Sequence, residues 1–149
     1  MTPEEAYNYA LKYGPSEETR RIACENSEFT YWYARDIDKC LHEDTKKAAC
    51  KEPEYAYLYA WGIDKKPGDD TRKTACKNSI YAYLYAFDID KCPRNDTRKA
   101  ACEDPHNAYF YALEIDKSFH EDTWEAVKGT EYEKEYNYSL NQIEKEKIV

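Results

Sequence analysis

Hydrophobic and polar positions follow a pattern that repeats every 26 residues along this chain. In residues 51–76, the apolar positions keep the helical spacing i, i+3, i+4, i+7 and are occupied by Ala56, Tyr59, Ala60 and Ile63. Between Pro53 and Lys65 only Gly62 could interrupt a helix, so this stretch predicts one of about 12 residues, which we call the A helix. Two alanines on its buried side would let a neighbouring helix approach closely.

A second, shorter helix, the B helix, is predicted from about Asp70 to Cys76. It follows a polar turn, and Thr71, Thr74 and Ala75 form its inner side. An aspartate stands directly before the repeating threonine, where an acid is expected to cap the helix and to complement its dipole. The copies of this aspartate are Asp44, Asp70, Asp96 and Asp122.

The two ends of the chain carry altered copies of this unit. Thr2 followed by Pro3 and Glu5 predicts an N-cap, a first helical residue and a capping-box partner. Ser27 and Ser79 are the equivalent polar starts of later A helices. At the other end, Tyr-Asn-Tyr-Ser at 136–139 is aligned with the Tyr-x-Tyr-Ala of earlier copies and gains one residue after the last repeating threonine. This copy predicts a closing helix over about 131–147 with no B helix after it.

The pattern therefore predicts an all-α solenoid of five helical hairpins and one closing helix, forming a single domain over residues 1–149. The atypical copies at 1–26 and 124–149 are typical of end caps, whose outer face must be compatible with water.

Two sequence words recur in the copies: Tyr-Ala-Tyr-Leu-Tyr-Ala-x-x-Ile-Asp-Lys and Asp-Thr-Arg-Lys-Ala-Ala-Cys. They resemble short tandem helical repeats of phage and bacterial proteins, most of which have no assigned function. The period is shorter than that of tetratricopeptide, ankyrin or HEAT repeats. The resemblance implies a helical-hairpin solenoid, encoded by a phage or a bacterium, and it carries over no catalytic residue.

The net charge of −8 is unevenly distributed. Residues 29–102 contain twelve acids and fourteen bases, whereas residues 103–149 contain twelve acids and five bases. No apolar run is long enough to span a membrane, and the first residues do not resemble a signal peptide. The sequence thus favours a cytoplasmic protein with no membrane partner.

Cysteine and histidine offer little chemistry. Four cysteines share one position near the end of the B helix: Cys24, Cys50, Cys76 and Cys102. Stacked helices lie about 8–10 Å apart, whereas a disulfide needs Cα atoms within roughly 7 Å, so neighbouring copies are too far apart to pair. Cys40 and Cys92 lie two copies apart, and no C-x-x-C pair occurs. His42 and His120 lie three copies apart, and His106 stands alone. We expect free thiols in a reducing compartment, solvated histidines, and no metal, cofactor or catalytic residue.

Two rows of charge repeat along the chain. Acids recur at Asp38, Asp64, Asp90 and Asp116, and paired bases recur at 20–21, 46–47, 72–73 and 98–99. The acids could imitate phosphates and the bases could bind nucleic acid. The near-neutral central copies favour instead a lattice of salt bridges between the two rows, and no direct nucleic-acid partner.

The face of the A helix opposite its buried side is the candidate partner-binding surface. Its side chains vary from copy to copy while the stacking positions do not. The candidate residues, which we call the outer-face band, are Trp32, Leu58, Trp61, Leu84, Phe87, Phe110 and Leu113. A structural reading stays open, in which the band packs beneath adjacent copies. An exposed apolar band would otherwise bind a partner.

The sequence therefore predicts a non-enzymatic module that binds another protein, with self-association left open. The alternative is an acidic inhibitor that occupies a nucleic-acid site on a host defence or restriction enzyme. Its acidic patch would comprise Asp116, Glu121, Asp122, Glu131, Glu133 and Glu135.

Overall fold

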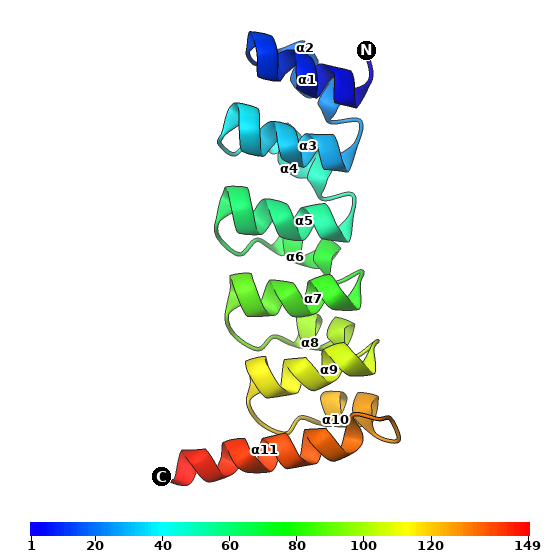
Figure 1. The fold of residues 1–149 in the computed structure, drawn as a ribbon, viewed down its shortest axis with the longest axis vertical. Helices are drawn as coiled ribbons and strands as arrows, with labels where there is room; N and C mark the ends of the chain where they lie inside the picture. The colour runs from blue at the N-terminus through cyan, green and yellow to red at the C-terminus, as the bar shows by residue number, and fades with distance from the viewer. The chain divides into compact units, whose positions relative to one another are not determined.

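A computed structural model describes residues 1–149 and contains eleven α-helices, four short π-helical segments and no strand (Figure 1). The chain divides into two compact units, Met1–Ala75 and Cys76–Val149, and each is described by itself. The all-α class and the series of helix pairs are confirmed. A single domain over 1–149 stays a prediction.

In the first unit, each helix pair packs on the next. Its elements are α1 (Pro3–Tyr13), α2 (Glu17–Ala23), α3 (Ser27–Tyr33), η1 (Ala34–Asp38), α4 (Glu43–Ala49), α5 (Pro53–Tyr59), η2 (Ala60–Asp64) and α6 (Asp69–Ala75). The A helices are α1, α3 with η1, and α5 with η2, and the B helices are α2, α4 and α6.

The second unit repeats this arrangement and ends on the closing helix. Its elements are α7 (Ser79–Tyr85), η3 (Ala86–Asp90), α8 (Asn95–Ala101), α9 (Pro105–Phe110), η4 (Tyr111–Asp116), α10 (Glu121–Val127) and α11 (Glu133–Ile148). Helix α11 packs against α10 and η4.

The predicted inner faces are confirmed. Ala56, Tyr59 and Ala60 are fully buried, and Ile63 is half-buried. Equivalent small clusters form the core between neighbouring A helices. One comprises Ala34, Ala49 and Tyr59, and its counterpart comprises Ala86, Ala101 and Tyr111. Alanine at these positions leaves room for the tyrosine ring of the next copy.

Within the units, a buried tyrosine–threonine hydrogen bond fastens an A helix or the closing helix to the B helix before it. The Oη–Oγ1 distances are 2.8 Å for Tyr33 and Thr19, 2.8 Å for Tyr59 and Thr45, 2.8 Å for Tyr111 and Thr97, and 2.9 Å for Tyr136 and Thr123. Each phenol also donates to the backbone carbonyl that precedes the B helix. Because both partners are buried, each bond replaces solvation that the hydroxyls lose on folding.

The second half of most A helices is π-helical, which the sequence pattern did not predict. Each π segment ends at a lysine with left-handed backbone: Lys39, Lys65, Lys91 and Lys117, with φ between 52° and 54°. In η1, the Lys39 N–H donates to the Ala34 carbonyl over five residues at 2.9 Å, and Lys91 does the same to Ala86 in η3. Left-handed backbone costs a non-glycine residue roughly 1 kcal/mol, yet lysine occupies the position in all four copies that have a π segment.

The predicted A-helix starts are confirmed, whereas the predicted caps of the B helices are not. Thr2, Pro3 and Glu5 form the predicted capping box. Ser27 and Ser79 begin their helices as predicted, and the side chains of Asn26 and Asn78 cap those helices. The B-helix aspartates, by contrast, lie inside the first turn rather than at the predicted N-cap. Asp44, for example, accepts the Thr45 N–H at 2.8 Å. These aspartates still complement the helix dipole.

The alignment of the last copy is corrected by two residues. Tyr136, not Tyr138, is the buried tyrosine that bonds Thr123, whereas Tyr138 is 68% exposed. The bond to Thr123 spans 13 residues, close to the 14 of the other joints. Burial and the phenol's hydrogen bond therefore set the register of the last copy, and the similarity of its sequence to Tyr-x-Tyr-Ala does not set it.

None of the helices has both the length and the apolar character that crossing a bilayer requires.

Candidate functional site

The two charge rows pair with each other within each unit. The pairs are Arg20 with Asp38 at 2.8 Å, Lys46 with Asp64 at 2.9 Å, and Arg98 with Asp116 at 2.6 Å. All three carboxylates are almost fully buried. In these three pairs the first base of a B helix holds the aspartate of the following A helix, so neither charge is free to bind a phosphate or to imitate one.

This pairing bears on the alternative acidic patch. Asp116 has only 3% of its side chain exposed and is held by Arg98, so its carboxylate is not a surface charge. The hydrogen bond to Asp116 also raises the pKa of Arg98. Glu121, Glu131 and Glu135 are exposed, while Asp122 and Glu133 are half-exposed.

The cysteines and histidines form no site. All six cysteines are free, and no group of His, Cys, Asp and Glu residues could hold a metal ion. The four B-helix cysteines are half-buried rather than buried, and Cys40 and Cys92 are exposed. Burial raises the pKa of Cys24 and Cys50 to about 11, so these two remain thiols at neutral pH.

The residues of the outer-face band differ in exposure. Trp61 in the first unit is 55% exposed and Phe87 in the second is 46% exposed. The other members are half-buried: Trp32, Leu58, Leu84, Phe110 and Leu113. Trp61 and Phe87 occupy the same position in their copies, one residue after the buried alanine, and are therefore the most accessible anchors.

The half-buried aromatic residues make contacts within their own unit. The Arg35 guanidinium lies 4.4 Å from the centre of the Trp32 ring, a cation–π geometry. Phe110 lies within 6.4 Å, between ring centres, of His106, Tyr109 and Tyr83. Phe110 therefore contributes to packing as well as to the surface.

Each unit contains a groove between the ends of two successive A helices, built from the same six repeat positions. The Gly62 groove in the first unit encloses about 270 Å³ and is lined by Ala34, Arg35, Lys39, Gly62, Ile63 and Lys65. The Glu114 groove in the second unit encloses about 350 Å³ and is lined by Ala86, Phe87, Lys91, Glu114, Ile115 and Lys117.

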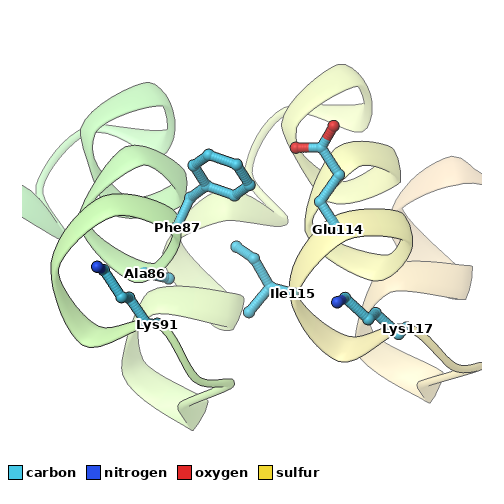
Figure 2. Close-up of a pocket in the computed structure, with 6 residues that line it drawn as sticks. All are labelled: Ala86, Phe87, Lys91, Glu114, Ile115 and Lys117. Atoms are coloured by element: carbon cyan, nitrogen blue, oxygen red, sulfur yellow. The ribbon is translucent and has the colours of Figure 1, made fainter.

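Figure 2 shows how the Glu114 groove is arranged. Ile115 points from η4 into the space between the two helices. Phe87 and Glu114 lie on one side of it, and Lys91 and Lys117 lie on the other. The groove thus has an apolar floor between an aromatic or acidic edge and a basic edge.

A tyrosine at each joint reaches across to the position that Glu114 occupies. Tyr83 donates its hydroxyl hydrogen to the Glu114 carboxylate, and Tyr7 donates to Asp36 Oδ2 at 2.8 Å. At the closing helix, the Tyr109 hydroxyl lies 3.3 Å from Ser139 Oγ. Burial, followed by the bond to Glu114, raises the pKa of Tyr83.

At the Gly62 groove no acceptor occupies this position. A Cβ atom added to Gly62 would lie 3.4 Å from the Tyr31 hydroxyl, so the missing side chain would point at that group. The sequence pattern identified the outer-face band but not these lysines, this tyrosine or the glycine.

In comparisons with known proteins, no family model, curated protein or solved structure matches the chain.

Proposed function

We propose that this chain binds another protein on the outer face of its A helices, without catalysis. The observation that carries the proposal is the exposure of Trp61 and Phe87 at one repeat position. Phe87 lines the Glu114 groove, and Trp61 directly precedes Gly62 in the chain. The stacking positions, by contrast, keep alanine and tyrosine. The side chains that vary between copies therefore lie on the outer face, where a partner could contact them.

Large aromatic side chains are the residues that most often dominate the energetics of protein interfaces. A ring that is half exposed gains little from the fold, and burying it against a partner removes its apolar surface from water. The remaining members of the band would supply contacts around these anchors. The inferred partner is a protein surface or peptide with apolar side chains. We further propose that the protein is encoded by a phage or a bacterium, as the resemblance to short tandem helical repeats implies.

The test uses peptides selected on the wild-type protein from a displayed random library. The selected peptides, labelled for fluorescence anisotropy, are then titrated with wild-type protein and with Trp61→Ser. Loss of the anchor should weaken binding by about 2 kcal/mol or more while helix content and melting temperature stay the same. The control is Tyr138→Ser, which removes an aromatic side chain that is also exposed but lies outside the band.

Equal binding by both variants, or a collapse of the fold in Trp61→Ser, would contradict the proposal. Salt separates it from the acidic-inhibitor alternative, because an apolar band gives weak salt dependence and an acidic surface gives a steep one. Sedimentation of the free protein reports whether the band instead joins two copies of this chain.

A further inference from the structure

The Gly62 groove differs from its counterparts by one missing acceptor. In the neighbouring joint of the same unit Tyr7 donates to Asp36, and in the second unit Tyr83 donates to Glu114. Gly62 occupies the equivalent position between α3 and α5 and has no side chain. No carboxylate of the protein accepts the hydrogen of the Tyr31 hydroxyl, although Tyr31 is only 7% exposed.

The Arg35 side chain, which lies over the Tyr31 ring, cannot take over this role. The Arg35 guanidinium lies 5.6 Å from the centre of the Tyr31 ring and carries only donors. It already makes two hydrogen bonds with Asp36, at 2.6 and 2.8 Å. The hydroxyl hydrogen of Tyr31 therefore remains available to an acceptor from outside the protein.

The charge of the groove also differs from that of its counterpart. Arg35, Lys39 and Lys65 are the charged residues that line the Gly62 groove. The Glu114 groove has two lysines and an internal glutamate, and phenylalanine replaces the arginine. Neither Lys39 nor Lys65 forms an ion pair. The Gly62 groove therefore combines two unpaired lysines with a tyrosine donor adjacent to Gly62, where the counterpart contains a carboxylate.

We propose that the Gly62 groove binds the carboxylate of an aspartate or glutamate side chain of the partner protein. The hydroxyl of Tyr31 donates to one carboxylate oxygen, and Lys39 and Lys65 supply the compensating charge. Ile63, which is half-buried, contacts the methylene stem of the acidic side chain. The incoming group thus takes the place that Glu114 fills in the second unit, which is why a side-chain carboxylate is the inferred ligand.

This inference rests on the proposed function for the identity of the partner as a protein. The groove and the Trp61 anchor are adjacent in the chain, so an acidic residue next to an apolar one would engage both. The charge-assisted hydrogen bond fixes the register of the partner, and the aromatic anchor supplies most of its affinity.

The test titrates isotope-labelled full-length protein with three short peptides and follows amide chemical shifts. The probes are acetyl-Leu-Glu-Leu-amide, its glutamine counterpart, and acetyl-Leu-Leu-Leu with a free C-terminal carboxylate. The glutamate peptide should give saturable shifts centred on Gly62, Ile63 and Lys65. The glutamine peptide should bind about tenfold more weakly or not at all, which is the effect of losing one charged hydrogen bond.

Two variants locate the binding. Tyr31→Phe removes only the donor and should weaken the glutamate peptide about tenfold, whereas Tyr9→Phe in the same unit should not. Gly62→Glu places a carboxylate inside the groove and should abolish binding. Its control is Asn8→Glu, which adds the same charge at an exposed position of α1 and should leave binding unchanged.

Three outcomes would overturn the inference: equal shifts with the glutamine peptide, unchanged binding in Gly62→Glu, or binding of the free C-terminal carboxylate alone. If this test fails, the proposed function is still tested separately, by the loss of binding to selected peptides in Trp61→Ser. Conversely, a Trp61→Ser variant that still binds selected peptides while the groove binds glutamate would contradict the proposed function alone.

Discussion

The Gly62 groove and the Glu114 groove share six repeat positions but differ in how they treat one tyrosine hydroxyl. In the second unit, Glu114 accepts from Tyr83 and closes the joint with a charged hydrogen bond. In the first unit, Gly62 leaves Tyr31 without that acceptor and leaves Lys39 and Lys65 without a carboxylate in the groove. One joint is thus closed by an internal carboxylate, and the other lacks one and is the joint to which we assign a carboxylate ligand.

The largest effect should come from the positions that the two units share. Ala34→Leu and Ala86→Leu each insert extra volume where the alanine is fully buried beside a tyrosine of the next copy. Each change should lower the free energy of unfolding by about 1–3 kcal/mol through overpacking, measured by urea denaturation. Lys47→Leu on an exposed B-helix position is the control. If either alanine change proves neutral, the two units are not built on the same inner face.

A smaller effect should separate the two tyrosines. Tyr83→Phe removes a hydrogen bond to a carboxylate and should cost about 1 kcal/mol, because such bonds contribute roughly 1.5–3 kcal/mol when buried and less when half-exposed. Tyr31→Phe should change stability by less than about 0.5 kcal/mol, because no internal acceptor is lost. Thermal denaturation of the two variants measures the difference. Equal losses would show that Tyr31 has a structural partner after all.

A similarly small effect, of opposite sign, should come from the glycine itself. Gly62→Ala should stabilise the protein by about 0.5–1 kcal/mol, because glycine in a helix costs that much relative to alanine and the added Cβ would make ordinary contact with Tyr31. Glu114→Ala should act in the opposite direction by depriving Tyr83 of its acceptor. Chemical denaturation of both variants checks the two signs, and a destabilising Gly62→Ala would mean that the groove cannot tolerate a side chain.

Most of the fold could be predicted from the sequence, because the 26-residue pattern shows which positions of each helix face the core and which face outward. Ala56, Tyr59 and Ala60 follow helical spacing, and their burial in the structure follows directly from that pattern. The helix ends were harder to predict. A polar side chain can act as an N-cap or lie in the first turn, and the sequence does not distinguish these two hydrogen-bonding geometries.

The candidate site could be predicted only in part. The variable outer face was visible because its residues change while the stacking residues stay the same. The series Asp36, Gly62 and Glu114 was equally visible, but its meaning depends on a tyrosine 29 to 31 residues earlier in the chain. The π-helical turns and the left-handed lysines that shape the grooves have no simple spacing rule, so the groove itself could not be derived from periodicity.

The joints have a further consequence for how the protein forms during its synthesis. Within each unit, the hydrogen bonds described above connect residues at most 31 positions apart. Chains dominated by such local contacts fold quickly, since little loop-closure entropy is lost before the contacts form. Once the A helix that follows a helix pair has left the ribosome, the tyrosine of that A helix can bond the threonine of the preceding B helix. We expect pulse proteolysis of stalled nascent chains to show protection advancing in steps of about one repeat.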